Sequence, residues 1–407
     1  MTLTRARQED AGNSWQPRGT NQSGMRDSNE RLVLSLVRRH GGLAKSDIAR
    51  MTGLSAQTVS VIMRELETEQ LLLRREPLRG RVGQPSVPMS LNPEGAFFLG
   101  LKIGRRSADL VLVDFLGRPR AMQSRSYRYP QPAETVTFVE ASLEAMLQDL
   151  PAAHASRIAG LGIAMPFELW NWADAIGVPG ETMDAWRHAD IRAEIAERVP
   201  FPVYLENDAT AACSAELVFG EIGDLRHFIY FYVGSFVGGG IVLNGQLYPG
   251  PTGNAGAVGS MPVPGADRRP RQLIDVASIA TLEQAIGARG KDSSLLWTSP
   301  EDWGDLGPDL PAWIESAAAG LAYAIVAASS VIDFEAAIVE GWMPLDVRRR
   351  LVDAVRADIK AFDVEGIKVP ELREGRVGLH ARALGGASLP LTDRFLAGQG
   401  SFAKSAA

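Results

Sequence analysis

The chain has 407 residues, of which 45% are hydrophobic and 22% are charged, and its formal net charge is −6. This composition excludes a disordered, collagen-like or coiled-coil chain, and the length predicts two or three domains. Cys213 is the single cysteine, which excludes an internal disulfide and a multi-cysteine zinc site. No secretory signal is recognisable, and the apolar run over 317–332 is short for a membrane span. We therefore expect a cytoplasmic protein, without a membrane partner, in which that run is a buried helix.

The charge is distributed unevenly along the chain. Residues 1–92 carry 14 Lys and Arg against 9 Asp and Glu, whereas the rest of the chain carries 28 against 39. A basic N-terminal part on an acidic body favours contact between that part alone and a polyanion. Chance variation of surface charge would give the same asymmetry, so the motifs must decide whether the N-terminal part binds a polyanion.

Residues 1–27 are polar and show no hydrophobic periodicity, which predicts a disordered tail. Residues 28–92 predict a winged helix-turn-helix, because three amphipathic helical patterns are followed by two short strand patterns. The predicted elements are helices over 29–40, from Ser46, and from a Ser55 N-cap to about residue 70, and strands over 71–76 and 86–91.

The spacing of Ala49, Gly53 and Val59 supports this assignment. Two helices that cross steeply need a small residue where they touch, a turn that tolerates positive φ, and a branched apolar anchor one turn into the second helix. A three-helix packing unit without a DNA role would show the same spacing. The two-strand wing and the basic charge favour the DNA-binding interpretation.

The start of the third helix is expected to enter the major groove of double-stranded DNA. Gln57 is suited to a bidentate contact with an adenine edge, and Ala56 or Thr58 to a thymine methyl group. Ser60 is expected to be exposed on the same face of the predicted helix. Other basic side chains are expected on phosphates or in the minor groove, namely Lys45, Arg64, Arg79 and Arg81. Arg38 and Arg50 are interpreted equally well as solvated surface charges.

Beyond a linker at 92–95, strands and helices alternate, which predicts an α/β body over 93–396 and a C-terminal tail over 397–407. The predicted strands cover 97–103, 108–114, 158–164, 203–205, 228–233 and 240–243. The predicted helices cover 136–148, 190–198, 209–219, 310–332 and 345–362.

Six segments of the body stand out in order. They are LGLKIG at 99–104, LGIAMP at 161–166, LENDATAA at 205–212, VGSFVGGG at 233–240, NGQLYPGPTGNAGAVG at 244–259 and ARALGGASLPL at 381–391. In this order and spacing they resemble the ROK family of repressors and sugar kinases. With GRVGQP at 80–85, which looks like the wing of that family, the resemblance to ROK transcriptional repressors runs from about Asn29 to Leu391.

The resemblance implies a two-lobed body of the actin/hexokinase ATPase type behind a winged helix-turn-helix. It also implies a homodimer or dimer of dimers that represses sugar-related genes and whose body senses a sugar or sugar phosphate. Asn207 and Asp208 stand where the family has its Asn-Asp pair, so the resemblance places them on the ligand and gives Asp208 the position of the catalytic base. Capping of the helix at 209–219 by Asp208 is an equally good explanation of that residue.

The kinase motifs are altered. The resemblance aligns Lys102 with the acid that holds metal-bound ATP, and Arg105 and Arg106 fill the phosphate turn. An arginine pair attracts a phosphate but cannot hold magnesium, and a solvent-facing hairpin turn explains it equally well. Gly234 and 238–240 are retained, but a hairpin turn accounts for them without ATP.

Later motifs depart further from the family. Glu340 and Gly341 replace its late Gly-Gly turn, and the sugar and zinc motif reads Gly-Ala-Val-Gly-Ser, with Ala257 and Ser260 in place of Glu and His. The zinc loop at 268–278 has neither cysteine nor histidine, and Ile274 replaces a second Glu. We therefore expect no metal, no cofactor and no enzymatic activity. A regulator controlled without a ligand or by a partner remains an alternative, and a ROK sugar kinase is a weaker one.

Overall fold

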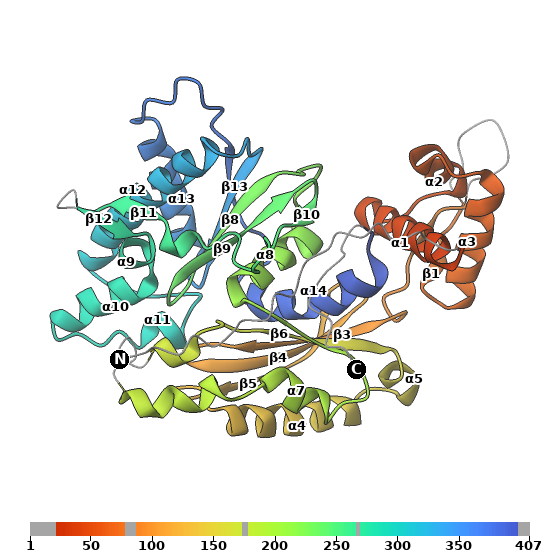
Figure 1. Ribbon diagram of the computed structural model, residues 1–407, viewed down its shortest axis with the longest axis horizontal. Coiled ribbons are helices and arrows are strands. Elements are labelled where there is room, and N and C mark those ends of the chain that lie inside the picture. The colour runs from red at the N-terminus through yellow and green to blue at the C-terminus, as the bar shows by residue number, and fades with distance from the viewer. Residues whose placement is uncertain (1–21, 78–86, 173–177, 266–268, 398–407) are drawn as a thin grey trace, which may run out of the picture.

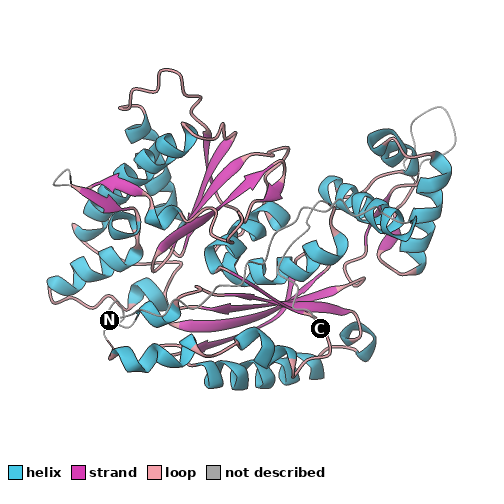
Figure 2. Ribbon diagram, in the orientation of Figure 1, coloured by secondary structure: helices cyan, strands magenta, loops and turns pink. Residues whose placement is uncertain are grey.

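The computed structural model describes residues 22–77, 87–172, 178–265 and 269–397. Figure 1 shows a small, mainly helical N-terminal domain at one side of a body made of two α/β lobes. Each lobe is built around a five-stranded sheet, and Figure 2 shows the two sheets as separate fans of strands with helices between and around them.

The N-terminal domain contains three helices and a two-stranded antiparallel ribbon. The elements are α1 (Gln22–His40), α2 (Lys45–Thr52), α3 (Ala56–Thr68), β1 (Leu72–Arg74) and β2 (Met89–Leu91). Val37, Ile48 and Val59 are fully buried between the helices. The helices and the ribbon thus follow the predicted order, with shorter strands.

The start of α1 differs from the prediction. The helix begins at Gln22, so the last residues assigned to a disordered tail are helical. Arg26 explains part of this extension, because its guanidinium pairs with Glu30 in the next turn and with Glu65 of α3. Residues 1–21 and most of the predicted C-terminal tail lie outside the described residues.

The first lobe has the strand order β5-β4-β3-β6-β7. Its strands are β3 (Phe97–Ile103), β4 (Ser107–Asp114), β5 (Pro119–Ser126), β6 (Ile158–Ala164) and β7 (Val203–Glu206). Helices α4 (Pro132–Gln148), α5 (Ala152–Ala155) and α7 (Ile191–Ala196) lie along the outer side of this lobe. The lobe also contains the 3-10 helices η1 (Leu169–Trp172) and η2 (Gly180–Arg187).

The second lobe has the strand order β10-β9-β8-β13-β14. Its strands are β8 (Phe228–Val233), β9 (Val237–Leu243), β10 (Gln246–Leu247), β13 (Ala336–Gly341) and β14 (Glu371–Glu374), with a ribbon of β11 (Pro262–Pro264) and β12 (Pro270–Gln272). Its helices are α9 (Ile274–Ala277), α10 (Ile279–Ala288), α11 (Leu295–Thr298), α12 (Asp309–Ser329), α13 (Leu345–Ile359) and the 3-10 helix η3 (Val258–Ser260).

The helix α12 is long and apolar enough to cross a membrane by length and composition alone. It packs on α13 and α9, and Ala317, Leu321 and Ile325 are fully buried in the core of the second lobe. The prediction of a buried core helix here is confirmed.

Two helices, α8 (Asp208–Phe219) and α14 (Ala381–Phe395), join the lobes. They pack on each other, while α14 also covers β3 and β6 and α8 covers β9. The helix α14 approaches the first sheet so closely that a Cβ on Gly100 or Gly162 would lie 2.0 Å from one of its carbonyl oxygens. Glycine is therefore required at these strand positions, and the last described helix completes the first lobe.

Candidate nucleic-acid interface and interlobe contacts

The turn between α2 and α3 has the expected geometry. Gly53 has a φ of 71° and ends α2, and the Ser55 hydroxyl accepts a hydrogen bond of 3.1 Å from the backbone N–H of Thr58. Val59, Ile62 and Leu66 are buried on the inner side of α3. Because burial fixes this inner side, the opposite face of α3 points to solvent.

The outward face of α3 carries four of the eight residues predicted to contact DNA. Ala56, Gln57 and Arg64 are exposed, and Ser60 is half-buried. Thr58 is different, because its hydroxyl lies 2.8 Å from that of Ser55 and is used in the helix cap. Its hydroxyl is consequently engaged within the protein.

Sequence reasoning missed Val61, which is 44% exposed on the same face. The signal was present in the spacing, because Val61 lies four residues after Gln57 and three before Arg64. Lys45 is exposed at the start of α2. Arg79 and Arg81 lie outside the described residues.

Arg38 is a contact between the DNA-binding domain and the body. Its guanidinium donates hydrogen bonds to the carbonyl oxygens of Phe115 (2.7 Å), which follows β4, and Val218 (3.4 Å) of α8. It also lies 5.2 Å from the centre of the Phe219 ring. Burial lowers the pKa of Arg38 to about 10. The interpretation of Arg38 as a solvated surface charge is therefore wrong, whereas Arg50 is exposed and pairs with Asp47.

Where the lobes meet, Lys102 of β3 faces Asp109 of β4 as a cross-strand pair. Its ammonium nitrogen lies 2.6 Å from the Asp109 carboxylate and 2.7 Å from the Ser107 hydroxyl. Burial, together with the charge of Arg382, lowers the pKa of Lys102 to about 8, and the ammonium in turn lowers the pKa of Asp109. The position that the resemblance assigns to a metal-holding acid is thus occupied by a buried ion pair.

The Asn-Asp pair starts α8, and its two members have different contacts. The Asn207 side chain caps the helix by accepting hydrogen bonds from the N–H groups of Ala209 (3.1 Å) and Thr210 (3.4 Å). The Asp208 carboxylate instead lies 3.1 Å from the guanidinium of Arg382 on α14. The explanation of Asp208 as the N-cap is therefore wrong, because the preceding asparagine has that role.

The arginines of the β3–β4 turn also have partners. Arg105 lies 3.2 Å from the carboxylate of Glu283 on α10, and Arg106 pairs with the other oxygen of the same carboxylate. Arg106 in addition lies over the Trp297 ring, 5.0 Å from its centre. The explanation of these arginines as a solvent-facing turn is wrong, because both form ion pairs with a helix of the second lobe.

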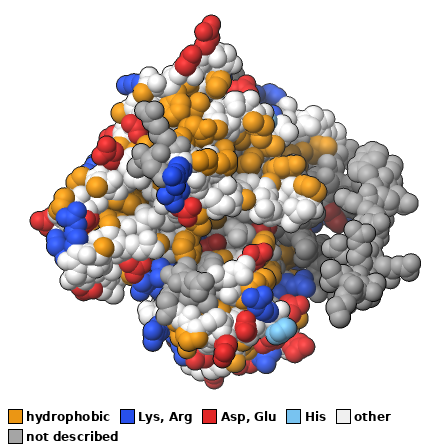
Figure 3. Space-filling view, turned by 60° about the vertical axis from the view of Figure 1, so that its left-hand side comes forward, with side chains coloured by type: hydrophobic (Ala, Val, Ile, Leu, Met, Phe, Trp, Pro, Cys, Tyr) orange, Lys and Arg blue, Asp and Glu red, His pale blue; other side chains and the backbone are white. Residues whose placement is uncertain are grey.

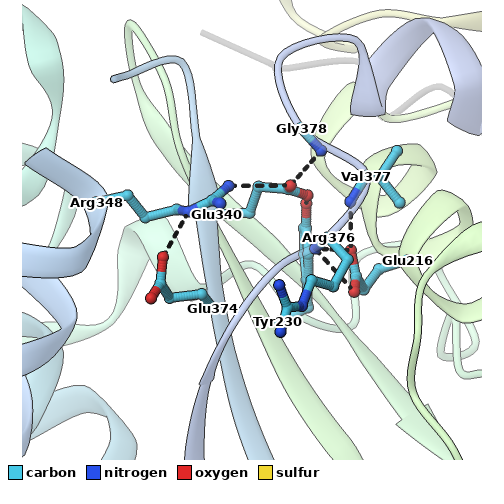
Figure 4. A network of polar contacts seen from close by, with 8 residues as sticks. All are labelled: Glu216, Tyr230, Glu340, Arg348, Glu374, Arg376, Val377 and Gly378. Atoms are coloured by element: carbon cyan, nitrogen blue, oxygen red, sulfur yellow. Dashed lines mark hydrogen bonds and ion pairs between the residues drawn. The ribbon is translucent and has the colours of Figure 1, made fainter. Parts of the chain in front are cut away.

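The end of β13 carries a buried polar network, which Figure 4 shows from close by. The Glu340 carboxylate accepts a hydrogen bond of 2.8 Å from the Tyr230 hydroxyl and another from the N–H of Gly378. Burial, with the neighbouring Glu216 charge, raises the pKa of Glu340 to about 7. Arg348 lies 3.4 Å from Glu340 and 3.2 Å from Glu374.

Glu216 of α8 completes this network from the other side. Its carboxylate accepts hydrogen bonds from the backbone N–H groups of Arg376 (3.0 Å) and Val377 (3.3 Å), and burial raises its pKa. Two buried carboxylates therefore hold the segment that leads into α14. A glutamate side chain occupies the place where the resemblance has a glycine turn for a nucleotide.

The remaining kinase-like motifs are structural in this chain. Residues 238–240 belong to strand β9, which starts at Val237, three residues earlier than predicted, so they are not part of a turn. Ala257 caps the 3-10 helix η3 and Ser260 ends it. Among the residues that the structure describes, no three His, Cys, Asp or Glu side chains gather closely enough to hold a metal ion.

Comparison with known protein families gives a match for each of the two parts of the chain. The ROK family profile matches residues 98–279, and a profile for winged helix-turn-helix DNA-binding domains matches residues 26–72. The chain contains a ROK family domain behind an N-terminal winged helix-turn-helix domain. Its fold is accordingly a winged helix-turn-helix followed by a two-lobed actin/hexokinase-type α/β body, as the sequence predicted.

Relatives in sequence include an uncharacterized protein and a repressor. The chain is 26% identical to protein y4fQ of Sinorhizobium fredii, over 91% of this chain and 92% of that protein, which is an uncharacterized protein. It is 25% identical to the xylose repressor of Bacillus subtilis, but the match covers only 58% of this chain and 60% of the repressor.

Solved structures agree on the fold. A ROK family transcriptional regulator, a homologue of the E. coli MLC protein, superposes with a TM-score of 0.65 at 20% identity, over 91% of this chain and 97% of that one. A Streptomyces griseus ROK glucokinase in complex with glucose and AMPPNP gives a TM-score of 0.56 at 20% identity, over 72% and 99%. The regulator shares the N-terminal part as well as the body.

Proposed function

We propose that the chain is a sequence-specific transcriptional regulator, most simply a repressor of sugar-related genes. Support comes from the exposed face of α3, with Gln57 and Arg64, on a winged helix-turn-helix that stands in front of a ROK body. The name of the xylose repressor, one of its relatives, favours a sugar-related target. A cytoplasmic location, where the protein meets DNA, is part of this proposal.

The body is proposed to sense a ligand without phosphorylating it. The Lys102–Asp109 ion pair supports this, because a buried ammonium group at the metal position repels magnesium. Asp208 would meet a sugar or sugar phosphate only if its pairing with Arg382 loosened, whereas the Asn207 carboxamide is already used in capping. A ligand would act by favouring one arrangement of the two lobes, which the arginine–Glu283 contacts bridge.

We further propose that the protein acts as a homodimer or dimer of dimers. Figure 3 shows hydrophobic side chains gathered on the upper part of one face, over the second lobe. In that lobe Val331 is 81% exposed, Leu345 63% and Tyr323 36%. Exposed apolar side chains such as these favour self-association of two chains. The two DNA-binding domains of the dimer would then read a pseudo-palindromic site.

The test is binding of the full chain to DNA fragments from its own genomic neighbourhood, at fixed salt, with and without a panel of sugars and sugar phosphates. Gln57→Ala should relax base preference, whereas Gln148→Ala, an exposed glutamine at the end of α4, should change nothing. Specific binding that no compound affects would support control without a ligand. Absence of specific binding would refute the proposal.

A further inference from the structure

The outward face of α3 combines an apolar side chain with polar neighbours. Gln57, Val61 and Arg64 follow one another at intervals of four and three residues, which places them on one stripe of the helix. Among the large hydrophobic residues of α3, all of which the structure describes, Val61 alone is exposed. The others, Val59, Ile62, Met63 and Leu66, are buried.

This valine contributes little to the stability of the domain. A β-branched residue lowers helix propensity compared with alanine, and a side chain that is 44% exposed gains little from burial. Packing inside the domain therefore does not account for a valine at this position. A binding partner that covers the stripe would account for it.

The charges around the stripe favour DNA as that partner. The acidic residues of α3 point elsewhere and are paired, Glu65 with Arg26 of α1 and Glu67 with Arg74 of β1. The stripe itself therefore carries no acid, and its one charge is the arginine at its C-terminal end. Such a surface suits the major groove, where the base edges offer one apolar group, the C5-methyl of thymine.

We infer that Val61 is a specificity-determining residue that packs against the C5-methyl group of a thymine in the major groove. This inference rests on the proposed DNA-binding function. Val61 lies four residues from Gln57, which is about 6 Å along the helix and close to the rise of two base pairs. The thymine is accordingly expected within about two base steps of the base that Gln57 contacts.

The experiment begins with in vitro selection of duplexes by the full chain. Each thymine of the selected half-site is then replaced by deoxyuridine, which removes the methyl group and leaves base pairing intact. One replacement should weaken wild-type binding about fourfold, the effect of one buried methyl group, and should leave Val61→Ala unaffected. Val61→Thr keeps the branched shape and one methyl group, so an intermediate effect is expected.

The controls distinguish failure of this inference from failure of the proposed DNA-binding function. Thermal unfolding of Val61→Ala should match or exceed wild type, which shows that lost discrimination is not lost folding. A selection that yields no preferred sequence refutes the proposed function itself. A preferred sequence without thymine in its half-site, or deoxyuridine effects that are equal in wild type and Val61→Ala, overturns the role of Val61 and leaves the DNA-binding function standing.

Discussion

Replacement of Arg38 by alanine tests how the DNA-binding domain is fixed to the body. The guanidinium donates to the Phe115 carbonyl at 2.7 Å and lies over the Phe219 ring, so its removal costs a charge-assisted hydrogen bond and a cation–π contact. Together these are worth about 2–4 kcal/mol. Relief of the buried charge offsets part of that loss, because burial holds the pKa near 10. We expect the free energy of unfolding to fall by about 1–2 kcal/mol.

Calorimetry and urea unfolding measure this effect, and Arg39→Ala is the matched control. Arg39 is the next residue of α1, and it is 45% exposed and pairs with the fully exposed Asp224, so its loss should cost under about 0.5 kcal/mol. Uncoupling by Arg38→Ala should also broaden or split the thermal transition, because the domain and the body would unfold less cooperatively. Equal stability and equally sharp transitions in the two variants would refute the role given to Arg38.

Four other outcomes are expected. Glu283→Gln should lower unfolding stability by about 1–2 kcal/mol, and the difference from wild type should shrink in 1 M salt; a difference independent of salt would contradict an ionic link between the lobes. Glu340 has a pKa near 7 in the folded chain, above its unfolded value, so the folded state binds the extra proton and stability should fall as pH rises from about 5 to 7. Glu340→Gln should flatten this pH dependence of stability in urea titrations, and an unchanged slope would show that other groups cause it. Lys45→Ala and Arg64→Ala should each reduce the salt slope of operator binding by about 1, and an unchanged slope would remove them from the phosphate contacts. A coupled assay with ATP and hexoses should show no turnover, whereas turnover that depends on Asp208 would restore the kinase interpretation.

The sequence predicted the elements well where a pattern is local. The three helices of the first domain follow from helical spacing and from the Ser55 cap, and strands such as β3 and β6 are runs of mainly apolar residues. The helix α14 had no such signal, because two adjacent glycines and Pro390 lower its helix propensity. Its conformation is set by close packing on β3 and β6.

Pairings between distant residues were not predictable. Glu283 lies far along the chain from Arg105 and Arg106, and nothing local indicates that a turn of one lobe meets a helix of the other. The partner of Lys102 was within reach, because a tight hairpin after Ile103 places Asp109 directly opposite. The roles of Arg38 and Asp208 required the three-dimensional contacts of α8 and α14.

The position of α14 has a consequence for the newly made protein. This helix follows every other described element in the sequence, yet it covers β3 and β6 of the first sheet. The segment after it reaches α1, where the N–H of Ala397 donates a hydrogen bond to the Ser35 hydroxyl. A chain still attached to the ribosome therefore has its DNA-binding helices before the surface on which they dock is complete. A truncated product that lacks α14 would lose the contacts of this helix with α1 and would hold its DNA-binding domain only by contacts such as those of Arg38 with Phe115 and α8.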